Sequence, residues 1–266
     1  MYLSYISNLN QETVKYLEKA GDTLEAALII PDLKNIVVAL TDSALAMAGV
    51  PIPVGAVVSG FVSIYDKVKE AILLNKAVEF ATEFSTIPIV DREDLINRMN
   101  DDPIYGHKFG TLLLVSLDRL DFDIKAKYLA RACKFYHLNY VNKVGFIRLK
   151  TMIENINMGD VEEYILIKDK VGYEDYPADF LFKRPSSQAN PTYGSFLNLG
   201  IVYQKYDFEK MSQAMLQNDK FTNSGKFSRV IQTEFTTIGR QLYYIINDIE
   251  PTTKTVENWL YTLKVQ

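Results

Sequence analysis

One stretch of this chain, from Ser43 to Tyr65, carries no charge over 23 residues, and it limits the possible folds more than any other feature. A run of that length can cross a bilayer as a helix. Two prolines interrupt it, Pro51 and Pro53, and proline removes a helical hydrogen bond and clashes with the preceding turn. One straight helix is therefore a poor description. The sequence instead predicts two short apolar arms joined by a glycine-proline turn.

This apolar hairpin, predicted over residues 35–65, has two possible interpretations. The arms, near 36–48 and 54–65, are each short for a membrane span, which favours a re-entrant insertion element. Small residues along both arms allow close helix contact, as in membrane bundles. The alternative is the hydrophobic central hairpin of a soluble helical core. The hairpin residues singled out for insertion are Gly49, Pro51, Pro53, Gly55, Val57 and Gly60.

Apolar residues recur at helical spacing through the rest of the N-terminal two-thirds of the chain. Helices are expected over 11–33, 66–86, 91–100, 104–120, 123–138 and 140–158, with Asp91 as an N-cap. Residues 168–189 are rich in turn-forming residues and form a connector. The sequence therefore predicts a mainly α fold. It comprises a helical domain over 1–167 and a small α+β domain over 190–266 that ends in a helix.

The order of elements in the C-terminal domain is informative. A short helix ends at Leu199-Gly200, an extended run follows, SRVIQTEF alternates as a strand does, and Thr236–Arg240 opens a helix with a threonine cap. This order resembles a winged-helix module, with a long insertion over 206–227 where a simple wing needs only a hairpin. Many winged helices bind protein rather than DNA, so the resemblance implies a fold more than a ligand.

Charge is unevenly divided along the chain. Residues 1–182 carry 19 basic and 26 acidic side chains, a balance of −7, whereas residues 183–240 carry eight basic and four acidic ones, a balance of +4. Aromatic residues are interleaved with those bases, and basic grooves lined by aromatic rings hold single-stranded nucleic acids. We therefore predict a polyanion site there, with a short single-stranded nucleic acid as the ligand, although solvated lysines around a small core explain the same pattern. The residues expected at this site are Tyr203, Lys226, Phe227, Arg229 and Arg240.

The sequence contains no recognisable catalytic or metal-binding motif. The only histidines, His107 and His137, and the only cysteine, Cys133, do not supply the three or four ligands of a zinc site. No phosphate-binding glycine loop and no nucleophile turn occurs. A single cysteine excludes an internal disulfide and fits a reducing compartment. We therefore expect no catalytic residue, no metal and no cofactor, and a protein that is not an enzyme.

The layout as a whole resembles membrane-acting effectors of bacterial antiphage defence. The turn Gly49–Gly55 and the region Leu199–Arg240 carry this resemblance. The similar families are the abortive-infection alpha-type proteins and the channel-forming effectors of Hailong-type systems. The resemblance implies a homo-oligomer at the bacterial inner membrane or in the cytoplasm, a channel held closed by an oligonucleotide, and a partner nucleotidyltransferase that makes the ligand. The alternative is a soluble helical regulatory protein with a winged-helix module that binds protein or DNA.

Overall fold

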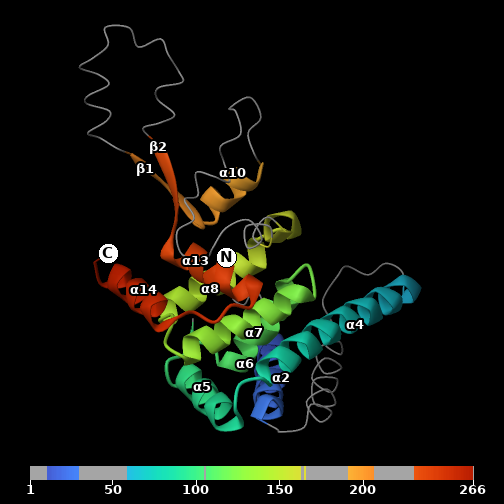
Figure 1. Cartoon of the computed structure of the whole chain (residues 1–266). Coiled ribbons are helices and arrows are strands. Elements are labelled where there is room, and N and C mark those ends of the chain that lie inside the picture. Colours follow the sequence, from blue (N-terminus) through green and yellow to red (C-terminus); the bar gives the residue numbers. More distant parts are fainter. Residues whose placement is uncertain are drawn as a thin grey trace, which may run out of the picture. The chain divides into compact units, whose positions relative to one another are not determined.

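The computed structural model describes residues 11–29, 59–104, 106–162, 165, 191–206 and 231–265 (Figure 1). Over these residues the chain is mainly helical and includes one pair of strands, so the predicted fold class is confirmed at that level. The chain divides into two compact units, Met1–Glu154 and Asn155–Gln266. The connector predicted at 168–189 lies outside the described residues.

The helices of the first unit follow the predicted order with shifted boundaries. Their bounds are α2 (Gln11–Ile29), α4 (Ser59–Phe84), α5 (Ile89–Asp101), α6 (Phe109–Arg119), α7 (Ile124–His137) and α8 (Lys143–Asn155). The helix expected to begin at residue 66 begins at Ser59, so α4 includes the end of the charge-free stretch. The expectation that Asp91 is an N-cap is wrong, because Pro88 occupies that position and Asp91 lies in the first turn of α5, where the helix dipole still favours its charge.

Helix α6 is the centre of the first unit. Every residue from Phe109 to Leu117 is buried, and a helix that is buried on all sides must be surrounded by other elements. α2, α4 and α5 all contact it. α6 begins five residues later than predicted because Ile104 and His107 close a tight turn in which Gly106 has a φ of +78°. Glycine adopts that left-handed conformation without steric cost.

The second unit contains α10 (Pro191–Asn198), the antiparallel strands β1 (Val202–Tyr206) and β2 (Ile231–Phe235), α13 (Thr237–Asn247) and α14 (Thr253–Val265). α10 ends as the sequence predicts, with Gly200 at a φ of +71° and the amide of Ile201 bonded to the carbonyl of Phe196. Helix α14 packs on α13 through the edge of Trp259 against Tyr244, with ring centroids 5.2 Å apart.

A short helix over 158–162 also belongs to the second unit, and its N-terminus is tied to α10. Asn157 caps this helix by accepting the amide hydrogen of Asp160 at 2.9 Å. The buried carboxylate of Asp160 accepts a hydrogen bond of 2.5 Å from the Ser195 hydroxyl on α10. The contact joins two segments that are separated along the chain by the undescribed residues before α10.

Much of the predicted apolar hairpin lies outside the described residues. These include Gly49, Pro51, Pro53, Gly55 and Val57, whereas Gly60 lies in the first turn of α4. The insertion expected over 206–227 is likewise undescribed beyond Tyr206. No helix within the described ranges combines the length and the apolar character that crossing a membrane requires.

Candidate functional site

Two of the five residues predicted to bind a polyanion lie in the described part of the second unit. Arg240 is exposed in the first turn of α13, and Tyr203 is exposed on β1. Lys226, Phe227 and Arg229 lie outside the described residues.

The junction between the strands and α13 is built around Thr236, the predicted cap. Its hydroxyl accepts the amide hydrogen of Gly239 at 2.9 Å and lies 2.7 Å from the Gly200 carbonyl, to which it donates. Its own amide donates to the carbonyl of Ile201 at 2.9 Å. A Cβ on Gly239 would meet that carbonyl oxygen at 2.1 Å, so only glycine permits this approach. The junction therefore fixes the start of α13 against β1, with Arg240 directed to solvent.

A helix start of this kind has a defined chemistry. The dipole at a helix N-terminus favours negative charge, and the exposed guanidinium of Arg240 adds a full positive charge. Tyr203 is exposed on β1, and tyrosine is one of the side chain types on which bases of single strands stack. The described part of the second unit thus presents the kinds of groups that a phosphate-bearing ligand uses.

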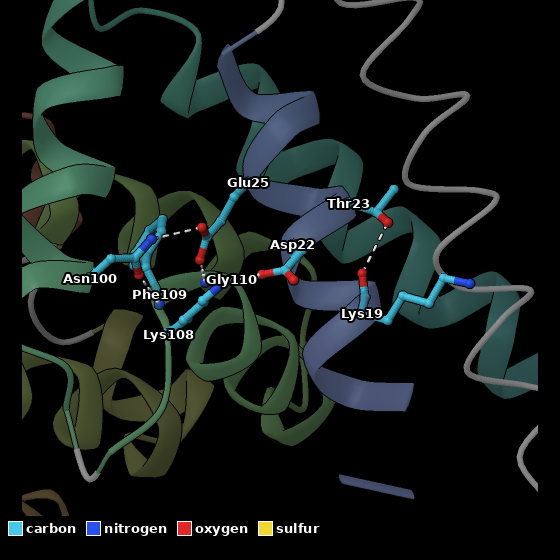
Figure 2. A network of polar contacts seen from close by, with 8 residues as sticks. All are labelled: Lys19, Asp22, Thr23, Glu25, Asn100, Lys108, Phe109 and Gly110. Carbon is cyan, nitrogen blue, oxygen red and sulfur yellow. Dashed lines mark hydrogen bonds and ion pairs between the residues drawn. The ribbon is translucent and has the colours of Figure 1, made fainter. Parts of the chain in front are cut away.

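A second polar centre lies in the first unit, where α2 meets the N-terminus of α6 (Figure 2). The Glu25 side chain on α2 accepts the Gly110 amide hydrogen at 2.5 Å and an Asn100 amide hydrogen at 2.8 Å. Asn100 in turn accepts the Phe109 amide hydrogen at 2.8 Å. Glu25 is only 8% exposed, so its charge depends on these donors and on the dipole of α6. The centre holds α2 in place and leaves no carboxylate oxygen of Glu25 without a donor.

Two glycines bring the backbones of α2 and α6 together beside Glu25. A Cβ on Gly110 would lie 2.1 Å from the carbonyl oxygen of Gly21, and a Cβ on Gly21 would lie 2.5 Å from the amide nitrogen of Thr111. At the surface, Lys108 and Asp22 form an ion pair at 2.8 Å, and this hydrogen bond raises the pKa of Lys108. The contact between α2 and α6 therefore combines tight backbone packing with charge pairing.

Helix α4 is fixed by contacts along its C-terminal half. Glu79 pairs with Lys127 at 2.9 Å, Glu83 forms a two-point pair with Arg131 at 3.0 and 3.3 Å, and the buried ammonium of Lys76 donates to the carbonyl of Leu120. The burial lowers the pKa of Lys76, although nearby aspartates oppose the shift. These contacts hold α4 along α7, beside which it lies in Figure 1.

Arg92, at the start of α5, joins the ends of two helices. Its guanidinium donates to the carbonyl of Leu28 in the last turn of α2 and to those of Ser85 and Ile87 just after α4. This buried side chain thus bonds one carbonyl in the last turn of α2 and two in the turn between α4 and α5. Both α2 and α4, the helices on either side of the apolar stretch, are thus tied to α5 by one residue.

The residues considered for metal or thiol chemistry are dispersed. Cys133 is fully buried in α7, and burial raises the pKa of its thiol, as expected of a cysteine that acts as a small hydrophobic residue. His137 lies 3.8 Å from the Asp91 carboxylate on α5. Among the described residues, no group of three or more His, Cys, Asp or Glu side chains is placed to hold a metal.

The sequence did not single out Glu25, Gly110, Arg92 or Lys76. One signal was available, since Gly21 and Gly110 each stand inside an apolar helical pattern, and an isolated glycine there often marks close packing. Nothing in the local pattern distinguishes Glu25 or Arg92 from charged residues on a helix surface.

Comparison with known proteins gave no match to a family model, to a curated protein or to a solved structure.

Proposed function

We propose that this protein is a membrane-acting effector of bacterial antiphage defence whose apolar segment, residues 35–65, enters a bilayer. The observation that carries the proposal is the 23-residue charge-free stretch, whose last seven residues, Ser59–Tyr65, open α4. The C-terminal half of the same helix is ion-paired to α7. One continuous helix therefore joins the apolar segment to the folded unit.

The other boundary of the segment supports the same proposal. Helix α2 ends at Ile29, and the contacts of Glu25 and Arg92 hold its last turns. A segment bounded on both sides by fixed helices can enter a membrane while the helices themselves remain packed. The oligomeric channel implied by the resemblance would then present one such segment from each copy.

The C-terminal unit would bind the ligand that controls the membrane segment. The order α10, β1, β2 and α13 favours a winged-helix-like module, although the described residues include neither a third strand nor two long helices before it. The start of α13 with the exposed Arg240, and the exposed Tyr203 on β1, favour a polyanionic ligand such as a short single-stranded nucleic acid. By resemblance alone, a partner nucleotidyltransferase would make this ligand.

Vesicle flotation and dye release test the membrane proposal. The wild-type chain should float with vesicles of bacterial lipid composition and release a trapped dye. Val57→Asp should abolish both effects, because a charge in an apolar segment is costly to insert. The matched control is Val90→Asp on α5, where the side chain is already 77% exposed and should tolerate the charge. A wild-type chain that stays entirely in the aqueous fraction would overturn the proposal.

Fluorescence anisotropy with a labelled single-stranded oligonucleotide tests the ligand proposal. Arg240→Gln should weaken binding and reduce the slope of log affinity against log salt by about 0.7, the value for one lost phosphate contact on a single strand. Arg148→Gln, an exposed arginine in the acidic first unit, should leave the slope unchanged. Binding that is indifferent to salt would rule out contact with phosphates.

A second candidate is a soluble regulatory protein that uses its winged-helix-like unit to bind protein or duplex DNA. The strand-helix junction at Thr236, which lies in the element order of a winged helix, favours it. Aqueous recovery together with tight binding of duplex DNA or of a protein partner would favour this alternative.

A further inference from the structure

Helix α4, which lies along α7 in Figure 1, ends in two turns of nearly identical sequence. Residues 77–80 read Ala-Val-Glu-Phe, and residues 81–84 read Ala-Thr-Glu-Phe. The alanines and phenylalanines of both turns are buried, and the two phenylalanine rings stack with their centroids 5.3 Å apart. A displacement of α4 by four residues would therefore bring the alanine, glutamate and phenylalanine of one turn to the places that the same residues of the other turn now occupy.

Helix α7 presents basic side chains at the same four-residue spacing. Glu79 pairs with Lys127 at 2.9 Å. One turn further along both helices, Glu83 pairs with Arg131 at 3.0 Å, so the two helices are parallel. If α4 moved by one turn toward its own N-terminus, Glu83 would lie opposite Lys127 and could form an ion pair of the same kind. The charges therefore allow two alignments of α4 along α7, which we call its registers.

The buried groups allow a displacement in one direction only. Movement toward the C-terminus of α4 would bring Lys76 to the place of Phe80, which has no exposed surface, and an ammonium is costly to bury there. Movement toward the N-terminus brings the ring of Phe80 to the buried place of Lys76. The ammonium then leaves the Leu120 carbonyl for the place of Ile72, where a side chain is 43% exposed. An advance toward the N-terminus thus returns a buried charge to water.

Contacts at the C-terminal end of α4 hold it in the register of this structure, the resting register. Arg92 donates to the carbonyls of Ser85 and Ile87, in the turn after the helix. Extending residues 85–87 would lengthen this connection by about 5 Å, at about 3.3 Å per extended residue against about 1.5 Å per helical one. An advance by four helical residues requires about 6 Å. The advanced register is therefore within reach, but it gives up the Arg92 bonds and one ion pair, so it is the less populated one.

We propose that α4 has two registers on α7, one helical turn apart, and that the second advances the N-terminal end of α4 by about 6 Å. That end begins with Ser59–Tyr65, the last residues of the charge-free stretch. Closely packed side chains interlock only where a repeat allows it, so the helix changes register in one step. The step transmits a displacement from the folded unit to the apolar segment. This use of the step rests on the proposed function, whereas the existence of two registers does not.

Disulfide trapping in the full chain, without lipid, tests for the advanced register. The pair Glu83→Cys with Lys127→Cys lies one turn out of register in the structure and is aligned only when α4 advances. The pair Glu79→Cys with Arg131→Cys is the matched control, because it removes the same two ion pairs but is aligned only when α4 retreats. Cys133 is buried and should not compete.

The advanced pair should cross-link at least about tenfold faster than the control pair, because two cysteines form a disulfide only when their Cα atoms come within about 7 Å. Equal rates would overturn the inference, since a helix that merely loosens brings both pairs together alike. A failure of both pairs to cross-link would overturn it as well.

A distance measurement keeps the test decisive should the cysteine pairs disturb the fold. Spin labels on Asn75→Cys and Lys134→Cys should move apart by about 5 Å when α4 advances. Arg131→Gln should enlarge the population at the longer distance, because it breaks one resting ion pair and leaves Lys127 as a partner for Glu83. Lys127→Gln also breaks one resting pair but removes the partner of the advanced register, so it should not. A single unshifted distance in all three chains would overturn the inference.

The same chains separate this inference from the proposed function. Two registers in a chain that neither floats with vesicles nor releases dye would reject the membrane proposal alone. Flotation and dye release by a chain that shows one register throughout would overturn the inference and leave the membrane proposal standing.

Discussion

Replacing Gly110 with alanine should destabilise the first unit, even though alanine is the better helix former. The new Cβ would lie 2.1 Å from the carbonyl oxygen of Gly21 and 2.9 Å from Cγ of Glu25. Carbon atoms in ordinary contact lie about 3.5 Å or more from such neighbours. The backbone of α2 must therefore move away from α6 by more than about 1 Å.

The magnitude follows from three contributions. Overpacking in a tight core costs about 1–3 kcal/mol. Displacing α2 also disrupts the 2.5 Å hydrogen bond from the Gly110 amide to the buried Glu25 carboxylate, and a bond to a charged group contributes about 1.5–3 kcal/mol. Against this, alanine gains up to about 1 kcal/mol in helix propensity. The net loss in free energy of unfolding should be about 2–4 kcal/mol.

Urea unfolding followed by far-UV circular dichroism measures this loss. The matched control is Gly194→Ala in α10, where a Cβ would meet no heavy atom within 4 Å. That variant should be slightly stabilised, since it gains helix propensity without a clash. If Gly110→Ala were as stable as the wild-type chain, the close backbone contact between α2 and α6 would be refuted.

Three further predictions follow from buried groups. Gly239→Ala should disrupt the junction with β1, because the new Cβ would lie 2.1 Å from the carbonyl oxygen of Ile201. The fluorescence of Trp259, the only tryptophan, should report the loosening of the second unit. An unchanged fluorescence spectrum and an unchanged unfolding midpoint would contradict this. Cys133 should resist Ellman's reagent in the native chain and react fully in urea, because the thiol is buried and burial raises its pKa; rapid native reaction would show that α7 is exposed. Burial lowers the pKa of Lys76 below 10.5, so the unfolded chain holds the ammonium proton more tightly than the folded chain does. The free energy of unfolding of the wild type, relative to that of Lys76→Met, should therefore rise as the pH increases toward 10.5. A relative free energy that stays constant or falls would contradict the burial of Lys76.

Local patterns were sufficient to predict most of the elements. The helical spacing of apolar residues predicted α5 to α8 to within a few residues, apart from the late start of α6. The threonine cap at Thr236 and the helix end at Gly200 were also predicted, because each depends on chemistry within four residues along the chain. The start of α4 was missed, since Ser59–Tyr65 was assigned to a separate apolar arm.

Only part of the candidate site could be found in this way. Tyr203 and Arg240 were chosen from composition and element order, and both are exposed where a ligand could reach them. Their partners in the prediction, Lys226, Phe227 and Arg229, lie outside the described residues. The network that holds α2 was not foreseen at all, because Glu25 has the same sequence neighbourhood as any acidic residue on an amphipathic helix.

The sequence by itself determined which segments become helices, how two of them are capped, and that one stretch near the N-terminus carries no charge. The tertiary structure alone decided which of those helices meet. Glu25 bonds to an amide 85 residues away, and Arg92 bonds to a carbonyl 64 residues away. The parallel packing of α4 along α7, in which Glu79 pairs with Lys127 and Glu83 with Arg131, arises in the same manner. Helix formation depends on neighbours within one turn of the chain. Which helices pack together depends instead on how the first unit closes around α6, and a local sequence pattern does not predict that.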